Sequence, residues 1–334
     1  MLGYFQEAEI INEDGMAESN PAEELEQILG NFSSFAPRIK HKEPKKIDSS
    51  GRSTLRFSYM SFRDGKPTFD DFINTVYGQM IAFCIPRTEI KKATDVVSSS
   101  DFIAVSQVMT ELSDRARNLF MKARKGSHRS GEAGEIILFI FTEWLLRAPQ
   151  IVSKMYLKTN HQMPIHGTDG IHAKYDEDKK KLYLYWGESK AHATLDSALK
   201  SAISSISDFL SSDQVDREIQ IIHSQLELEG LSQEAVAEIL KYLNPYEAES
   251  NNRVIVHSCL LIFERKSLWD GDLDKEEEFF LDELNVVSED AINKIQNVLD
   301  ENDLKQHRFE FFLLPVPSVQ DLRDKFQEKV GMPK

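Results

Sequence analysis

The sequence predicts an α/β fold in which helices flank a mixed β-sheet. Residues 253–263 form a nearly continuous apolar run, which is typical of a central strand buried on both faces. Residues 171–175 and 182–186 are β-prone and are separated by a charged turn, so they predict a hairpin. Residues 101–125 and 194–210 repeat apolar side chains at helical spacing, which predicts two amphipathic helices.

The same patterns predict the remaining elements. In chain order we expect a strand at 55–62, helices at 69–86 and 131–146, a short strand or extended link at 154–160, helices at 215–225, 232–243, 288–299 and 318–330, and a strand at 307–314. The helix at 131–146 is apolar nearly all round beyond Glu135, so we expect it to be deeply buried, with Ser130 as its N-cap.

The chain divides into an arm and one folded domain. Residues 1–50 are first acidic and then basic with several prolines, a composition typical of a flexible, charged arm. We expect folded structure over residues 51–334, with a helical insertion at about 213–245.

The composition narrows the class of protein. There are only two cysteines, Cys84 and Cys259, so a disulfide framework is excluded and a cysteine-based zinc site is not expected. The acidic N-terminus lacks a secretory signal pattern, and no apolar run is long enough to cross a membrane. We therefore expect a soluble, cytoplasmic protein without a membrane partner.

The net charge of −15 argues against a broad nucleic-acid-binding surface, which is normally basic. Basic residues are dense in the folded region only around the end of the 101–125 helix: Arg115, Arg117, Lys122, Arg124, Lys125, His128 and Arg129. Cations also suit a helix C-terminus, so this group fits a solvated helix end as well as a phosphate-binding surface. A chain this acidic needs a local basic groove, a bound cation or a partner if it acts on DNA.

Asp169, Glu188 and Lys190 form the strongest candidate site. Side chains alternate along a strand, so Glu188 and Lys190 point to one face, and the hairpin brings Asp169 close to Glu188. Two neighbouring carboxylates repel each other unless a cation lies between them. Mg²⁺ prefers such oxygen ligands, and the backbone carbonyl of Ser189 is a further candidate ligand. The metal would polarise a phosphoryl oxygen, and Lys190 would orient a water or offset charge.

Glu132 and Glu135 lie three residues apart at the start of the 131–146 helix and share a face. A carboxylate at the mouth of a buried helix is costly unless it is paired or bound to a metal. We expect Glu135, which is closer to the buried stretch, to hold the waters of the metal or a second metal. Glu132 is the alternative.

These residues resemble the signature of the PD-(D/E)xK nucleases, which share the restriction-endonuclease-like fold: an Asp, a later Glu-x-Lys, and an upstream helix that carries Glu. More narrowly, segments 131–135, 167–170 and 187–190, in this order, are similar to those of HamA, the nuclease subunit of the bacterial Hachiman anti-phage defence system. The resemblance spans roughly residues 50–320. Thr168 stands where the superfamily name has proline.

The resemblance implies a DNA endonuclease that depends on Mg²⁺, or alternatively on Mn²⁺, with a catalytic core at about 101–265. It implies that Asp169 and Glu188 bind the metal, that Lys190 is the catalytic lysine and that Glu135 is the helix carboxylate. It also implies a helicase partner, HamB, which would hold the DNA that an acidic chain cannot grip.

Other interpretations stay open. A Glu-x-Lys triplet alone is common at surfaces, where it forms a salt bridge of little energetic value. His166, His172 and His192 flank the site as a candidate His/Asp zinc site or as residues that face the substrate or support the ligands. His192 either contacts phosphate or is an ordinary strand-end histidine. The rival function is a non-catalytic subunit that regulates a helicase.

Overall fold

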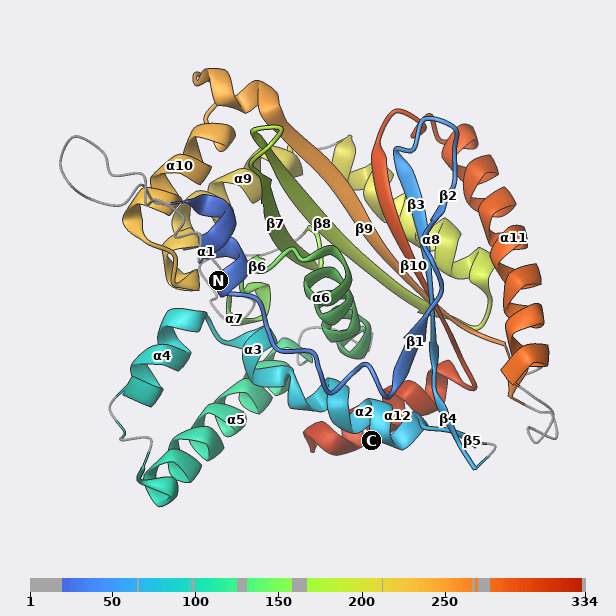
Figure 1. Cartoon of the computed structure of the whole chain (residues 1–334), viewed down its shortest axis with the longest axis horizontal. Helices are drawn as coiled ribbons and strands as arrows, with labels where there is room; N and C mark the ends of the chain where they lie inside the picture. The colour runs from blue at the N-terminus through green and yellow to red at the C-terminus, as the bar shows by residue number, and fades with distance from the viewer. Residues whose placement is uncertain are drawn as a thin grey trace, which may run out of the picture.

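The computed structural model describes residues 20–331, except 65, 96, 98–99, 125–130, 158–166, 212, 266–267 and 270–276. A curled mixed sheet dominates this part of the chain, in the order β1-β3-β10-β9-β8-β7-β6, with β2 also paired to β3 (Figure 1). The strands are β1 (Ile39–His41), β2 (Lys45–Lys46), β3 (Ser53–Met60), β6 (Gln150–Val152), β7 (Gly170–Asp176), β8 (Lys181–His192), β9 (Arg253–Glu264) and β10 (Arg308–Val316). Strands β4 (Phe62–Arg63) and β5 (Lys66–Pro67) form a separate small ribbon.

The centre of the sheet is parallel and its borders are antiparallel. Strands β3, β10, β9 and β8 run parallel, whereas β7 and β6 on one side and β1 and β2 on the other are antiparallel. Strand β9 is buried continuously from Val256 to Phe263, as expected for a strand covered on both faces. The predicted α/β architecture with a mixed sheet is therefore confirmed.

Helices cover both faces of the sheet. The helices of the described chain are α1 (Pro21–Gln27), α2 (Phe69–Gly78), α3 (Met80–Cys84), α4 (Arg87–Asp95), α5 (Phe102–Arg124), α6 (Glu132–Leu146), α7 (Lys154–Leu157), α8 (Leu195–Leu210), α9 (Gln214–Gln225), α10 (Gln233–Leu243), α11 (Glu277–Glu301) and α12 (Val319–Val330). Short 3₁₀ turns are η1 (Leu226–Glu229) and η2 (Ala248–Asn252). In Figure 1, α6 lies in front of the strands and α8 behind them.

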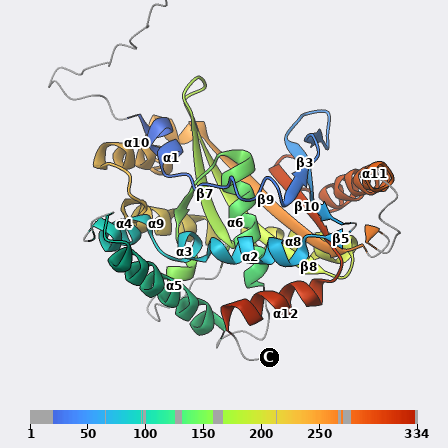
Figure 2. The ribbon, with the colours of Figure 1, turned by 60° about the horizontal axis from the view of Figure 1, so that its bottom comes forward.

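The two faces are distinguished by alternate side chains of β8. A side chain at Gly187 would meet Leu138 of α6 at 2.8 Å, so this position faces α6. The neighbouring Trp186 packs on Phe209 of α8, with 4.7 Å between ring centroids. Glu188 and Lys190 share the parity of Trp186 and therefore project toward α8. Helices α2, α5 and α12 close one end of the molecule (Figure 2).

Several boundaries differ from the sequence predictions. Residues 20–50 are part of the fold, because Leu25, Phe32 and Phe35 are buried and β1 pairs with β3; residues 1–19 lie outside the described residues. The helix predicted at 69–86 is divided at Gln79 into α2 and α3.

Three further boundaries were wrong. Instead of an extended link at 154–160, strand β6 is followed by α7, and residues 158–160 are outside the described part. Helix α11 begins at Glu277, well before the predicted position 288. Strand β8 does not end near Gly187 but runs through the Glu-x-Lys triplet to His192, because β9 pairs with it along that whole length.

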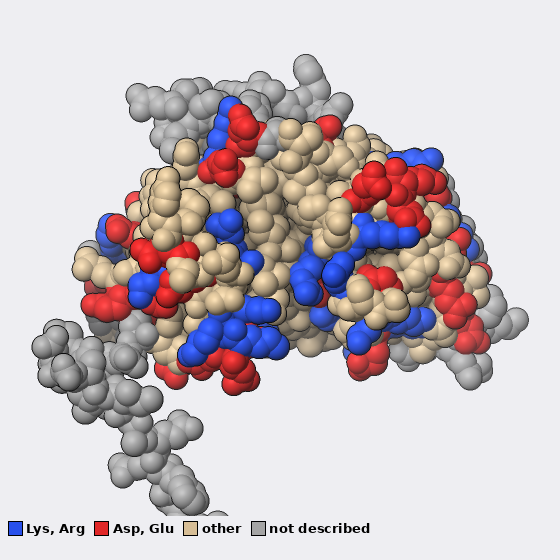
Figure 3. All heavy atoms as spheres, turned by 90° about the horizontal axis from the view of Figure 1, so that it is seen from above, with Lys and Arg blue, Asp and Glu red and all other residues tan. Residues whose placement is uncertain are grey.

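Charge is unevenly distributed over the surface despite the net charge of −15. On the face shown in Figure 3, Lys and Arg side chains border a hollow of uncharged residues, and Asp and Glu side chains cluster at its margins. Burial first, and then the charge of Arg147, lower the pKa of Lys174 in β7. The acidic excess therefore does not make every face of the described structure acidic.

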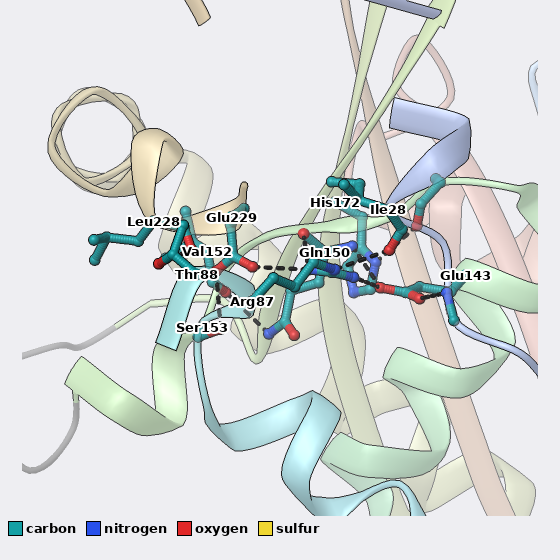
Figure 4. A network of polar contacts seen from close by, with 12 residues as sticks. Ile28, Arg87, Thr88, Glu143, Gln150, Val152, Ser153, His172, Leu228 and Glu229 are labelled. Carbon is teal, nitrogen blue, oxygen red and sulfur yellow. Dashed lines mark hydrogen bonds and ion pairs between the residues drawn. The ribbon is translucent and has the colours of Figure 1, made fainter. Parts of the chain in front are cut away.

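A buried network around Arg87 joins parts of the chain that are far apart in sequence (Figure 4). The Arg87 guanidinium contacts Glu143 of α6 at 2.6 Å and Glu229 of η1 at 2.7 Å. It also donates to the carbonyls of Ile28 and Gln150, both at 2.8 Å. The network therefore ties the N-terminal segment, α4, α6, β6 and η1 together.

We expect Arg87→Met to be strongly destabilising, because it leaves the carboxylates of Glu143 and Glu229 buried without their cation. The cost of breaking such a pair is about 3–5 kcal/mol, measured as the free energy of unfolding in urea. The control is Arg63→Met, which removes the exposed ion pair with Asp71 and is expected to cost at most about 1 kcal/mol. Equal effects of the two substitutions would contradict a central role of Arg87.

Candidate active site

The hairpin of β7 and β8 brings the predicted residues together. The strands pair antiparallel with Gly170 opposite Gly187, and the Asp169 N–H donates to the Gly187 carbonyl at 2.7 Å. Asp169 therefore lies opposite Glu188, as the sequence predicts. Strand β7 begins at this point, at Gly170, whereas β8 continues past Gly187 to His192. The last residues of β8 are thus paired with β9 on one edge and are free of β7 on the other.

The carboxylate of Asp169 binds this free edge. Its Oδ2 atom accepts hydrogen bonds from the Ser189 backbone N–H at 2.8 Å and from the Ser189 hydroxyl at 3.0 Å. In the described part of the chain both bonds fall on Oδ2, which leaves Oδ1 available. Since the N–H and C=O of one strand residue point the same way, the Ser189 carbonyl lies on this edge too.

The side chains of Glu188 and Lys190 project from β8 toward α8 and form an ion pair with each other. Glu188 is 8% exposed. Burial, and then the negative charge of Asp169, raise the pKa of Glu188 to about 7, against the opposing effect of Lys190. A carboxyl group that resists ionisation beside a second carboxylate would gain from a cation between the two.

A cavity of about 290 Å³ opens beside this group. Asp169, Glu188 and Lys190 line one side, and Ser205, Asp208 and Phe209 of α8 line the other. The sequence analysis did not single out Ser205 and Asp208. Their three-residue spacing places both side chains on one side of α8, which the sequence shows, whereas only the structure shows that this side faces β8.

A buried ion pair holds the loop that leads into Asp169. The Lys154 ammonium of α7 donates to the Thr168 carbonyl at 2.8 Å and to its hydroxyl at 2.9 Å, and it pairs with Glu218 of α9. Lys154 and Glu218 are each 1% exposed. Gly167 has φ +149° and passes so close that an added Cβ would lie 2.1 Å from the Glu218 carboxylate. The loop therefore requires glycine here.

The predicted helix carboxylates approach the site from the other side of the sheet. Glu132 is buried and Glu135 is half-buried in the first turn of α6, and neither is among the described residues that line the cavity. Between them, Gly134 faces the Ser189 hydroxyl, which would be 3.1 Å from an added Cβ. Helix α6 thus supports Ser189, while Glu188 and Lys190 project toward α8. The role predicted for Glu135 stays a prediction.

The flanking histidines separate into different environments. His172 is buried on the α6 face, with Nδ1 2.9 Å from the Ala148 carbonyl, and it does not line the cavity. His192 is half-buried at the end of β8, and burial, then the charges of Arg323 and Lys190, lower its pKa. His166 and Ser130 lie outside the described residues, and the N-cap of α6 is Gly131 rather than the predicted Ser130. The sequence analysis missed His257 of β9, which is buried in the cavity wall.

Within the described residues, no three His, Cys, Asp or Glu side chains are grouped as a metal site. A zinc site of several histidines therefore finds no support there. The carboxylates of Asp169 and Glu188 both line the cavity, and the Ser189 carbonyl lies on the edge of β8 that Asp169 binds. These oxygen donors fit a hard cation that keeps part of its water shell.

The basic group predicted at the end of α5 is partly neutralised by carboxylates. Arg115 pairs with Glu89 and Arg117 pairs with Asp114. The side chains from residue 123 onward in this group lie outside the described part.

The fold and the site together define a mixed α/β protein with two carboxylates and a lysine at a free strand edge. The chain belongs to the HamA family, whose sequence profile matches residues 34–330. This membership links the chain to Hachiman defence and to a partner within that system. A comparison with curated proteins finds no match. Within the described residues, no helix combines the length and apolarity that a membrane crossing requires.

We expect Lys154→Met to destabilise the protein by about 3–5 kcal/mol, because it leaves Glu218 buried and unpaired. The double variant Lys154→Met/Glu218→Leu should recover much of this loss, since it removes both charges. Urea unfolding measures the coupling between the two positions. Lys241→Met, which removes the surface pair with Glu238, serves as the control. A single-variant cost no larger than the control's would contradict the role of this pair.

We expect stability to fall as the pH drops below about 6.5, the ordinary pKa of histidine. Burial lowers the pKa of both His172 and His257 to about 3, so each is neutral when folded and takes up a proton on unfolding. Each histidine therefore contributes stability that is present above pH 6.5 and is lost toward pH 3, at about 1.4 kcal/mol per pH unit.

The measurement is the free energy of unfolding between pH 4 and 7 for wild type and His172→Gln. The variant should show a shallower decline with acid, whereas replacement of the exposed His223 should leave the decline unchanged. An identical decline in wild type and His172→Gln would refute the assignment.

Proposed function

We propose that this chain is a metal-dependent deoxyribonuclease of the PD-(D/E)xK type that acts with a HamB-like helicase in Hachiman defence. One observation carries the proposal: Asp169, Glu188 and Lys190 meet at the free edge of β8, with the Asp169 carboxylate fastened to Ser189. A surface salt bridge would not explain why Glu188 is buried beside a second carboxylate.

Asp169 and Glu188, with the Ser189 carbonyl, would hold Mg²⁺, or Mn²⁺ as the alternative. When bound, such an ion supplies polarisation of a phosphoryl oxygen and a more acidic water. Two sets of hydrogen bonds hold the ligand residues in place before a metal binds. Oδ2 of Asp169 accepts from Ser189, and the Lys154 ammonium donates to Thr168. These contacts fix the carboxylate before substrate arrives, which reduces the reorganisation that the reaction requires.

Lys190 supplies the positive charge of the proposed active site. Its ammonium forms an ion pair with the Glu188 carboxylate, and both residues line the cavity. From this position it can orient an attacking water by hydrogen bonding or offset the negative charge that develops on the phosphoryl group. Helix α8 shelters the pair from bulk water and so strengthens these electrostatic effects.

The helicase partner follows from what this chain lacks. The sequence contains no Gly-x-x-x-x-Gly-Lys phosphate-binding loop, so ATP hydrolysis belongs to another chain. The net charge of −15 also disfavours strong binding of DNA by this chain alone. A helicase supplies both the ATP-driven motion and the grip on DNA.

The test is plasmid degradation with Mg²⁺ and the helicase partner. We expect Glu188→Ala and Lys190→Ala each to lower the rate by roughly 10²–10³-fold, the loss typical when a group that stabilises the transition state is removed. The matched control is Lys181→Ala, which removes a lysine from the opposite end of β8 and should keep full activity. Omission of Mg²⁺, with Mn²⁺ as a substitute in a parallel reaction, tests the metal.

Full activity in both site variants would overturn the proposal. So would a wild-type complex that hydrolyses ATP and binds DNA but leaves the DNA intact, a result that instead supports the rival function of a non-catalytic regulatory subunit. Each variant is compared with wild type for folding and for retention of the partner, so that a lost site is distinguished from a lost complex.

A further inference from the structure

The free edge of β8 carries a second charged group besides Asp169. The Nη2 atom of Arg323, in α12, donates to the Ala191 carbonyl at 2.7 Å. Gly187, Ser189 and Ala191 are alternate residues of one strand, so their backbone groups point to the same edge. Asp169 satisfies the first two positions and Arg323 satisfies the third. A carboxylate and a guanidinium therefore line one edge, two residues apart.

This spacing places the guanidinium close to the proposed centre. Two residues of strand span roughly 7 Å. The charges of one DNA strand recur about every 3.4 Å along a helix axis, so roughly 7 Å corresponds to the scale of one to two nucleotides. A phosphate at Arg323 would thus lie next to, rather than at, the phosphate between Asp169 and Glu188.

Arg323 is a half-buried cation without a carboxylate partner. Within the described residues it forms no ion pair, although α12 also carries Asp321 and Asp324, and Asp324 instead accepts from Gln320. Its Nε atom is buried and has no hydrogen-bond partner in the described structure. A sheltered guanidinium with an unmatched N–H costs free energy that a bound anion would offset.

Two other cationic or titratable groups, Lys190 and His192, lie near Arg323 at this end of β8. Lys190 and His192 project from β8 with the same parity, and the charges of Arg323 and Lys190 both act on His192. Arg323 and Lys190 thus place positive charge on both sides of His192, whose lowered pKa keeps the imidazole as a neutral hydrogen-bonding group. Phosphate oxygens are the anions that such a group of side chains, with a planar guanidinium, binds best.

We propose that Arg323, with the His192 imidazole as a second hydrogen-bonding group, binds a backbone phosphate of a nucleic-acid strand adjacent to the one at Asp169 and Glu188. This inference rests on the proposed nuclease function for its substrate class. It assigns Arg323 a binding role and leaves the chemistry to the hairpin residues. It also provides a local binding site for the DNA backbone, which the net charge of the chain does not predict.

The test measures DNA binding apart from cleavage. A dye-labelled single-stranded DNA 20-mer is titrated with the full chain in EDTA, by fluorescence anisotropy, at several KCl concentrations from about 50 mM. Arg323→Met removes the charge and keeps an unbranched side chain. We expect it to weaken binding about fivefold at 0.1 M salt and to lower the magnitude of the slope of log K against log[salt] by about 0.7, the effect of one lost phosphate contact to a single strand.

The matched control is Lys325→Met, two residues further along α12, where the lysine pairs with Asp70 at the surface. It should bind DNA as wild type does, although it loses the same charge. Arg323→Lys should retain most of the affinity. His192→Gln leaves the Ala191 contact intact and should weaken binding by a smaller factor, so the proposal stays testable even if Arg323→Met folds poorly.

The outcomes separate this inference from the proposed function. If DNA is cut in a Glu188-dependent manner but Arg323→Met and His192→Gln bind as wild type does, the phosphate site is wrong and the nuclease stands. If binding depends on Arg323 but no DNA is cut with Mg²⁺ and the partner, the nuclease is wrong and the phosphate site stands. No DNA binding by wild type at the lowest salt, or equal losses in Arg323→Met and Lys325→Met, also overturns the phosphate site.

Discussion

The site depends on one constraint: β8 is longer than the strand beside it. Strand β7 begins at Gly170, opposite Gly187, and β8 runs on to His192. The backbone groups on the uncovered edge still need hydrogen-bond partners, because an unpaired buried amide or carbonyl is costly. Asp169 and Arg323 supply those partners from their side chains. The same backbone requirement thus positions an anion and a cation along one line.

Close packing behind β8 makes this arrangement rigid. Helix α6 approaches so tightly that a side chain at Gly187 would collide with Leu138, and one at Gly134 would press on Ser189. Helix α6 is itself fixed by Glu143, which is bound to Arg87, Gly30 and Gln150. Glu188 and Lys190 are therefore carried by a regular strand of the core, and Asp169, one residue before β7, is hydrogen-bonded to that strand. This suits a site that must hold its geometry before substrate binds.

The sequence predicts those parts of the structure that local patterns determine. The alternation of β8 places Glu188 and Lys190 on one face, and the short turn of the hairpin places Asp169 opposite Glu188. The buried helix α6 and the two-sided strand β9 follow from their apolar runs. These features need no knowledge of distant contacts, and they contain most of the proposed chemistry.

Features that depend on distant contacts were not predicted. Phe32 and Phe35 lie in a short, partly apolar run within a segment whose composition predicts a flexible arm, and they are buried against Phe139 and Trp144 of α6. Lys154 is buried because Glu218, far along the chain, neutralises it, and no local pattern in the sequence indicates this pair. Arg323 meets Ala191 across more than a hundred residues. Glu135 was placed by helix position alone, which does not reveal the face of the sheet from which α6 approaches.

The acidic net charge of the chain is compatible with the proposed DNA site, because salt limits the range over which charges act on one another. Charges separated by more than about 8 Å of solvent are largely screened at physiological ionic strength. A phosphate at the edge of β8 therefore responds to the charges of Arg323 and Lys190 more than to acidic residues on distant faces. The remaining acid lowers the overall attraction to nucleic acid, so such a site binds weakly when alone. In the proposed complex this weakness has a use, because a nuclease that needs its helicase to deliver a strand does not attack DNA that the helicase has not engaged.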